Sequence, residues 1–378
     1  MKETFDVAVF GIGDLGSWVV EFLSRLPEME HRKILIADIN EEVIRKRAFS
    51  AWAGTSYLNK APKICIEKIN LFMEEETCRL LRKYNPRIIC NVTSLQSWWV
   101  VDELPRDLWS KLETEAGLGP WIPMHLTLTH KLMRAVKESG IDTLVVNTSF
   151  PDLTNPVLGK IGLAPSCGIG NADLLIPGIK REVSKRLNVP SRDVFVYLVG
   201  HHSHVMQFMI LGRSGSPYYL KIMVDDKDVT TMFDPDELIK SQLRDWLPGR
   251  YLHPIVASSA VKNIWNMLMD TGEISFAPGP NGEIGGYPIR ISAKGVEVVL
   301  PDGLKMEQAR QINIEAQKKD GVEEIKSDGT IIFTDKAHAL MKETMNYDCK
   351  ELKIDDNELR YQELLAKYKE LKRLHGLS

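Results

Sequence analysis

Three histidines within four residues are the densest group of acid/base side chains in the 378-residue sequence. His201, His202 and His204 follow the apolar run 194–199, directly after Gly200. Imidazole titrates near neutral pH, and side chains at strand ends in α/β proteins often line active sites. If the extended conformation continues, His202 and His204 share one face and His201 lies on the other. We therefore predict an acid/base role for this cluster.

A second chemical motif lies near the N-terminus and has the form G-x-G-x-x-G. Its members are Gly11, Ile12, Gly13, Asp14, Leu15 and Gly16. The motif follows a buried apolar run at 6–10 and opens an amphipathic helix at 14–26, which is the context of a dinucleotide-binding turn. The first glycine permits the tight bend, the second lets a diphosphate approach the backbone, and the third allows close packing of helix and strand. The free N–H groups of the helix then favour phosphate.

Asp38 specifies which dinucleotide we expect. It ends the second apolar run, 22 residues after Gly16, and Ile39 and Asn40 follow it without an adjacent arginine. A carboxylate there accepts hydrogen bonds from ribose hydroxyls and repels a 2′-phosphate, so we predict NAD rather than NADP. The polar turn Thr93-Ser94 closes the fourth strand and is predicted to line the same site. The alternative is a glycine turn of similar shape that binds no dinucleotide.

These motifs need a parallel sheet to bring them together. Apolar runs alternate with helical patterns in the first third of the chain, as in successive βαβ units. Strands are predicted at 6–10, 33–37, 63–67, 87–91 and 142–146, and helices at 14–26, 41–48, 74–84 and 122–138. The pattern predicts an α/β fold that opens with a doubly wound Rossmann domain over residues 1–150.

The remainder has a mixed character. Helices are predicted at 171–187, 254–270 and 304–318, a strand at 194–199, antiparallel strands within 205–232, and two strands across 287–300. We expect an α+β catalytic domain at 151–345 and a charged helix at 346–378, which lies on the surface or at a subunit contact. The long connection after the fourth strand carries Trp98, Trp99, Trp109 and Trp121, either as a lid over a substrate or as an inserted hydrophobic or subunit contact.

Composition excludes several classes of function. A net charge of −3 offers no general attraction to nucleic acid or anionic lipid, and no apolar run approaches the length of a membrane span. The five cysteines are widely spaced, which fits reduced thiols better than a disulfide or zinc framework. Since the N-terminus lacks the form of a signal peptide, we predict a cytoplasmic protein with a small-molecule substrate.

Several motifs, in their order along the chain, resemble the lactate/malate dehydrogenase superfamily, which includes the NAD-dependent glycoside hydrolase family 4. Beyond the glycine turn they are the segments 144–147, 168–173, 199–202, 258–260 and 287–296. The resemblance implies hydride transfer, with His202 as acid/base and Asp173 orienting its imidazole. It also places Asn147 near the nicotinamide, and Ser258 and Ser259 beside the substrate. Local alternatives remain for two of them: Asp173 as a helix N-terminal carboxylate and Asn147 as a turn residue.

The sequence also departs from the dehydrogenase pattern. The arginine that would clamp a substrate carboxylate, one turn after the catalytic aspartate, falls near Ile176-Pro177. A second arginine could come from Arg106 in the long connection, although a surface role is an equal alternative. The glycosidase branch binds a divalent metal through a cysteine whose place is taken here by Gly170, with Cys167 three residues away. We therefore expect no metal, while His202 and His204 leave that option open.

We conclude from the sequence that the chain is an NAD-dependent oxidoreductase acting on a secondary alcohol or ketone, and a homodimer or homotetramer. His202 and His204 are the acid/base candidates. One alternative is a glycosidase that uses NAD transiently with a metal. The other is a regulator that senses NAD(H) without turnover.

Overall fold

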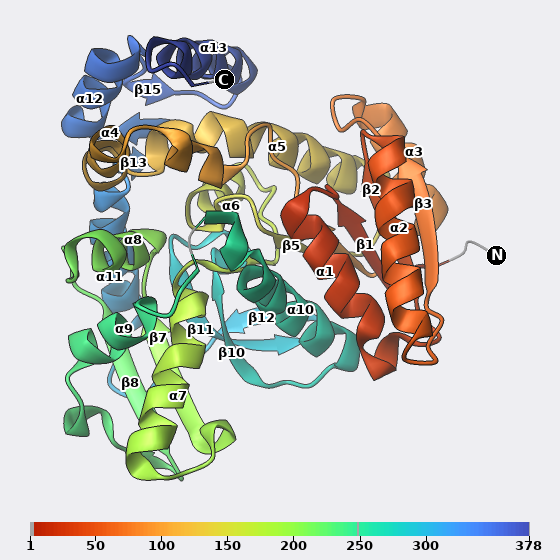
Figure 1. The fold of residues 1–378 in the computed structure, drawn as a ribbon, viewed down its shortest axis with the longest axis horizontal. Helices are drawn as coiled ribbons and strands as arrows, with labels where there is room; N and C mark the ends of the chain where they lie inside the picture. Colours follow the sequence, from red (N-terminus) through yellow and green to blue (C-terminus); the bar gives the residue numbers. More distant parts are fainter. Residues whose placement is uncertain (1–3, 248, 378) are drawn as a thin grey trace.

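The computed structural model describes residues 4–247 and 249–377 and has an α/β fold (Figure 1). Its main sheet has six parallel strands in the order β3-β2-β1-β4-β5-β6. The strands are β1 Val7–Phe10, β2 Lys33–Asp38, β3 Lys63–Lys68, β4 Ile88–Asn91, β5 Leu144–Asn147 and β6 Cys167–Gly168. The predicted doubly wound sheet is confirmed, and the two-residue β6 extends it by one strand beyond the five expected.

Helices cover both faces of this sheet, and its central strands β1 and β4 are buried on both sides. In β1, Val7 and Val9 join one buried cluster, whereas Ala8 and Phe10 join the other. On the first face α1 packs against α2 and α10, and on the second α3 packs against α5. The bounds are α1 Asp14–Arg25, α2 Glu41–Ser56, α3 Glu74–Tyr84, α5 Ile122–Ser139 and α10 His253–Met269.

The strand order reverses between β1 and β4, and this reversal opens a crevice at the carboxyl ends of the strands. Phe10 is paired with Ala37 of β2 and with Asn91 of β4. Gly11, Asp38 and Val92, which follow these three residues, therefore meet at one edge of the sheet. Ligands bind at such a switch point in open α/β sheets.

Two antiparallel sheets follow the main sheet in the chain. One has the order β7-β8-β9 and the other β10-β11-β12, and a bridge between Gly200 and Gly286 connects them. The strands are β7 Val194–Val199, β8 Tyr219–Val224, β9 Lys227–Asp228, β10 Ile274–Pro278, β11 Gly286–Ser292 and β12 Gly295–Val298. The accompanying helices are α6 Pro151–Lys160, α7 Ile176–Leu187, α8 His202–Leu211, α9 Pro235–Leu243 and α11 Met306–Lys319.

The prediction of strands throughout 205–232 was wrong for its first part, where α8 lies. The run from Val205 to Leu211 is almost continuously apolar, and such a run does not distinguish strand from buried helix. The preceding histidines favour the helix, because the backbone N–H of His201 donates to Nδ1 of His204 at 2.8 Å and this hydrogen bond caps the first turn. Gly212 ends the helix in the left-handed conformation, with φ of +67°.

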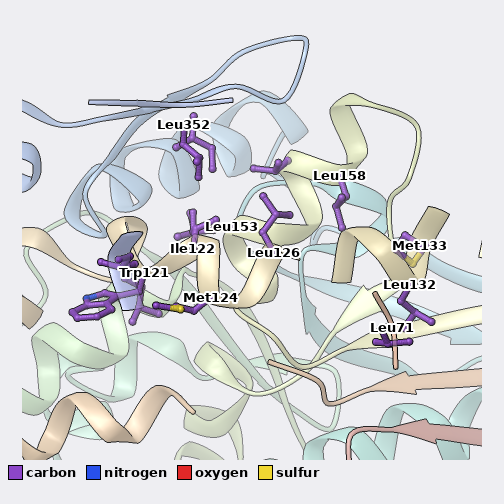
Figure 2. Packing of buried hydrophobic residues seen from close by; sticks show 14 of the residues in the cluster. Leu71, Trp121, Ile122, Met124, Leu126, Leu132, Met133, Leu153, Leu158 and Leu352 are labelled. Carbon is purple, nitrogen blue, oxygen red and sulfur yellow. The ribbon is translucent and has the colours of Figure 1, made fainter. Parts of the chain in front are cut away.

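Within 346–378, where we predicted a charged helix, the structure has α13 Asn357–Leu374 and the short strand β15 Glu351–Leu352. The strand completes a small sheet with β13 Val322–Ile325 and β14 Ile331–Phe333 of the preceding segment, which also contains α12 Asp335–Met345. The charged α13 packs against α5 (Figure 1). Figure 2 shows Leu352 in the same buried cluster as Ile122 and Leu126 of α5 and Leu153 of α6. This apolar cluster anchors the C-terminal region to α5 and α6.

The long connection after β4 is built from short helices. They are the 3₁₀ turn Trp98–Glu103, α4 Arg106–Lys111, a π-turn Leu112–Ala116 and the 3₁₀ turn Gly119–Trp121, which leads into α5. π-Turns are rare and frequently lie at functional sites. Within residues 4–247 and 249–377, none of the helices combines the length and the hydropathy that crossing a bilayer requires.

Candidate active site

The three glycines of the N-terminal turn have three different surroundings. Gly11 has φ of +90°, and a Cβ there would lie 2.7 Å from the carbonyl carbon of Val92. A Cβ on Gly16 would overlap the carbonyl oxygen of Gly11. A Cβ on Gly13, in contrast, would meet nothing within 4 Å. The turn is therefore closed behind the first and third glycines and open in front of the second, which is the opening that a diphosphate needs.

Helix α1 points its N-terminus into this opening. It begins after Gly13, and no side chain among the described residues caps its start. The first N–H groups of a helix have no partner within the helix, and they carry partial positive charge. Asp38 fixes the turn to β2, because Oδ2 accepts the backbone N–H of Ile12 at 2.7 Å and Oδ1 accepts that of Asn40 at 2.9 Å.

A cavity of about 440 Å³ lies in front of the turn, and we call it the glycine-turn cavity. Among its described lining residues there is no lysine or arginine. It is lined by most of the predicted cofactor residues, namely Gly11, Gly13, Asp14, Leu15, Gly16, Asp38, Thr93 and Ser94. Ile12 is buried beneath the turn and contributes its backbone to the bond with Asp38. An acidic group at the end of β2, in a cavity whose described lining has no lysine or arginine, agrees with the predicted preference for NAD over NADP.

A second cavity of about 240 Å³ adjoins the first, and we call it the histidine cavity. The two share six lining residues: Leu15, Ser97, Trp98, His125, Thr148 and Phe150. His202 lies in the wall of the second cavity, together with Trp98, Trp109, Trp121 and Trp246. Three of the four tryptophans from the long connection thus line the cavity, whereas Trp99 lies against the Arg250 guanidinium, 5.9 Å from its ring centre.

His202 is held by a carboxylate that the sequence did not point to. Nδ1 of His202 lies 3.2 Å from Oδ2 of Asp320, which follows α11, and Nδ1 of His201 lies 3.1 Å from the same oxygen. Asp320 is buried, and His202 keeps a small exposed fraction of 14%. Within residues 4–247 and 249–377, Nε2 of His202 has no hydrogen-bond partner, so this nitrogen is free to meet a ligand.

The two groups perturb each other's pKa in opposite directions. Burial disfavours the imidazolium of His202, but the adjacent Asp320 carboxylate, with smaller contributions from Asp152 and Glu113, outweighs burial and raises the pKa of His202 above its ordinary value. Burial likewise disfavours the charged form of Asp320, yet the two imidazoles hold the pKa of this carboxyl well below its usual range. The arrangement is an ionisable imidazole backed by a fixed charge, which suits acid/base chemistry near neutral pH.

The structure does not bring Asp173 to the imidazole. Lys262 Nζ lies 2.8 and 2.7 Å from the two oxygens of Asp173, and Ser259 Oγ donates to Oδ2 at 2.5 Å. The buried carboxylate of Asp173 is therefore paired with the partly exposed Lys262, and the partner of His202 is Asp320 instead. Ser259 is likewise buried and occupied, since it also accepts the N–H of Gly170 at 2.9 Å.

His204 does not face the histidine cavity either. The helical start of α8 turns it inward, where Nε2 contacts the carbonyl oxygen of Pro217 at 2.9 Å and the ring caps the helix through Nδ1. Burial lowers the pKa of His204 to about 4, so it is neutral at physiological pH. The expected common face of His202 and His204 is absent because the extended conformation ends at His201.

Asn147 ends β5 as predicted, but its amide is fully engaged in the protein. It is buried and donates to Thr154 and Asn155, while its oxygen accepts from Asn91. The network fixes the ends of β4 and β5 beneath the glycine-turn cavity, whose lining includes the next residue, Thr148. The amide of Asn147 itself does not line that cavity.

The remaining substrate candidates lie elsewhere. Arg106 begins α4, where it is exposed and outside both cavities. Ser258 is exposed on α10 and donates to the carbonyl oxygen of Pro254 at 2.8 Å. Neither cavity therefore presents, among the described residues, an arginine for a substrate carboxylate.

Sequence reasoning missed three further titratable residues of the site. Glu113 in the π-turn lines the histidine cavity, and burial raises its pKa to about 7. His125 lies where the cavities join and stacks on Phe150, with ring centres 3.6 Å apart; burial lowers its pKa to about 3. Buried Asp152 accepts a hydrogen bond from Asn171 Nδ2, and Asn171 lines the histidine cavity. Of these residues, the sequence pointed only to Asn171, which belongs to the segment 168–173 that resembles the dehydrogenase motif.

No protein-family model matches the chain, and no curated protein is similar to it in sequence. Solved structures are similar in fold. A lactate dehydrogenase from a Medee basin deep-sea metagenome library is 15% identical, with a TM-score of 0.58 over 84% of this chain and 97% of that one. Lactate dehydrogenase from Eimeria maxima with NADH and oxamate is 13% identical, with a TM-score of 0.59 over 84% and 92%. Malate dehydrogenase from Plasmodium falciparum with NADH is 14% identical, with a TM-score of 0.54 over 84% and 97%.

These likenesses confirm, at the level of the fold, the resemblance to the lactate/malate dehydrogenase superfamily that the motifs predicted. Over 84% of its length the chain is similar in fold to these solved lactate and malate dehydrogenases.

Proposed function

We propose that this protein is an NAD-dependent oxidoreductase that interconverts a secondary alcohol and a ketone, with His202 as the acid/base group. One observation carries the proposal: His202 lines a cavity that shares six residues with the glycine-turn cavity, and Asp320 holds its Nδ1 while its Nε2 has no hydrogen-bond partner among the described residues. The fold supports it, because two structures of similar fold are dehydrogenases with NADH.

The residues of the glycine-turn cavity fit NAD. The open space in front of Gly13 and the uncapped start of α1 suit the diphosphate, and Asp38 suits the adenosine ribose. Thr93 and Ser94 line the same cavity. Bound NAD supplies a nicotinamide ring that accepts or releases a hydride.

The protein's own part in the reaction is proton transfer and exclusion of water. In the oxidative direction Nε2 of His202 accepts the hydroxyl proton of the substrate, and in the reductive direction the imidazolium returns it. Asp320 stabilises the imidazolium and keeps Nδ1 as the donor side, which directs the reactive nitrogen into the cavity. The tryptophans of the histidine cavity replace water around the reacting carbon.

The test is the consumption of NADH at 340 nm with a panel of ketones, 2-oxo acids, keto sugars and amino ketones. We expect turnover with at least one class, unaffected by a chelator. His202→Gln should lower kcat by about 10²–10⁴-fold, the usual contribution of a positioned acid/base group, while NADH affinity stays unchanged. Full activity of this variant would contradict the proposal.

The same experiment separates the two alternatives carried from the sequence. A glycosidase that uses NAD transiently would cleave a glycoside without net NADH and would stop on chelation. Its cysteine ligand has no counterpart here, since Cys167 is buried in β6 and lies outside both cavities. A sensor would bind NADH, turn over nothing and tolerate His202→Gln. The homodimer or homotetramer that we also propose is open to sedimentation analysis.

A further inference from the structure

The histidine cavity has a largely apolar wall. It is built mainly of aromatic and aliphatic side chains, with Trp98, Trp109, Trp121, Trp246 and Phe150 as its aromatic members. No lysine or arginine is among its described lining residues. A substrate carboxylate would therefore be buried here without the cation that such a charge requires.

The charge that the cavity does present is negative. Glu113 and Asp102 both line it, and His202 and Asp320 form a pair whose opposite charges offset each other. Asp102 is already used, because Oδ1 accepts the indole N–H of Trp109 at 2.8 Å. Glu113 makes no hydrogen bond or ion pair with any residue in the described ranges, which leaves its carboxylate free for a ligand.

We propose that the substrate of the histidine cavity carries a protonated amine on an apolar body, and that Glu113 is the residue that recognises this amine. The inference rests on the proposed function above for the reaction at His202, and it names the substrate as an amino alcohol or amino ketone rather than a hydroxy acid. An ammonium group pairs with a carboxylate and is also attracted to the faces of aromatic rings. The four tryptophans and the phenylalanine complement the apolar remainder.

The raised pKa of Glu113 is consistent with a carboxyl group that has no cation paired with it among the described residues. This pKa is raised to about 7: burial is the main cause, the carboxylates of Asp320 and Asp102 act in the same direction, and the imidazole of His202 on α8 opposes them. A bound ammonium would lower this pKa and draw the carboxylate into its charged form. Binding of an amine should consequently release protons from Glu113 at neutral pH.

Binding of three probes of equal length tests the proposal without any turnover. The probes are 4-phenylbutylamine, 4-phenylbutan-1-ol and 4-phenylbutanoate, titrated calorimetrically into the full chain saturated with NADH. We expect the amine to bind at least 10-fold more tightly than the carboxylate. Glu113→Gln should reduce that preference to less than 3-fold while it leaves the affinity for the alcohol within 2-fold.

Glu115→Gln is the matched control. Glu115 lies two residues further along the same π-turn, pairs with Lys336 at 3.4 Å and does not line the cavity. This variant should keep the full preference for the amine, as should Glu113→Asp, which retains the charge. Tighter binding of the carboxylate by the wild type, or an unchanged preference in Glu113→Gln, would overturn the proposal.

The outcomes also distinguish this inference from the proposed function. Selective amine binding without any NADH consumption would sustain the recognition role of Glu113 and reject the reaction. NADH consumption with a 2-oxo acid but not with an amino ketone would sustain the reaction and reject the role of Glu113.

Discussion

Replacing Asp320 by asparagine should lower the pKa of His202, because it removes the charge that opposes the effect of burial. Oδ2 and Oδ1 of Asp320 lie 3.2 and 3.4 Å from Nδ1 of His202, which is the closest ion pair that the imidazole makes. An opposite charge at such a distance shifts a pKa by about 1–3 units. One unit equals about 1.4 kcal/mol, so the imidazolium should lose about 1.4–4 kcal/mol of stabilisation.

The pKa can be measured directly by NMR, from the pH dependence of the Cε1–H resonance of His202 in protein labelled with ¹³C-histidine. The spectrum of His202→Gln assigns the signal among the nine histidines. We expect a wild-type pKa above the ordinary value of about 6.5 and a value below it in Asp320→Asn. Asp335→Asn removes an exposed carboxylate that pairs with Lys350, and it should leave the pKa of His202 unchanged. A His202 pKa within 0.2 units of wild type in Asp320→Asn, on the order of measurement error, would refute the reasoning.

The same substitution should have a pH-dependent effect on the free energy of unfolding. The raised pKa of His202 stabilises the fold fully below about pH 6.5, and this contribution is lost as the pH rises through the folded-state pKa. The lowered pKa of Asp320 contributes above about pH 3.9 and is lost as the pH falls through its folded value. Urea unfolding should therefore show a larger destabilisation by Asp320→Asn at about pH 5.5 than at about pH 9. Equal losses at both pH values would count against the pair.

Two further predictions concern the cofactor turn and the predicted catalytic aspartate. Gly13→Ala should leave thermal stability near wild type but weaken NADH binding at least 10-fold, because the new Cβ enters open space that the diphosphate needs. Gly16→Ala should instead lower the melting temperature, because its Cβ overlaps the Gly11 carbonyl oxygen. Tight NADH binding by Gly13→Ala, measured calorimetrically, would contradict the first prediction. Lys262→Met should lower the free energy of unfolding in urea by about 2–4 kcal/mol, because it leaves the buried Asp173 carboxylate without its cation. The partial exposure of Lys262 keeps this loss below that of a fully buried pair, and the pKa of His202 should not change. A shifted His202 pKa with intact stability would instead restore Asp173 to the catalytic site.

The features that the sequence predicted well are those written in contiguous residues. The glycine turn, its strand and its helix lie within 20 residues, and the structure leaves no room for a Cβ at Gly11 or Gly16. Asp38 could be placed because it ends the strand that follows. The parallel order of β1 to β5 followed from the alternation of apolar runs and helices.

The partner of His202 could not be found in this way. Asp320 is 118 residues away in the chain and reaches the site only because α11 ends beside the start of α8. Nothing in its local sequence, two lysines before it and a glycine after it, separates it from a surface turn. Asp173 lies in a segment that resembles the dehydrogenase motif, but its carboxylate pairs with Lys262, 89 residues later in the chain. Charge pairing over such separations is a tertiary property.

The irregular segment after β4 shows the same limit. The tryptophans suggested either a lid or an inserted hydrophobic cluster, and three of them line the histidine cavity. Glu113 could not be predicted as a site residue, because a π-turn has no sequence signal of its own. The choice between strand and helix for Val205–Leu211 depended on backbone capping by histidine side chains, which is visible only in the structure. The division into domains at residues 150 and 345 stays a prediction.

A crystal structure of the protein soaked with NADH tests the central claim most directly. We predict the diphosphate in front of Gly13, the adenosine ribose on Asp38, and the nicotinamide at the junction of the two cavities, beside His125 and within reach of the space that Nε2 of His202 faces. A dinucleotide bound elsewhere, or a nicotinamide pointing away from the histidine cavity, would contradict it.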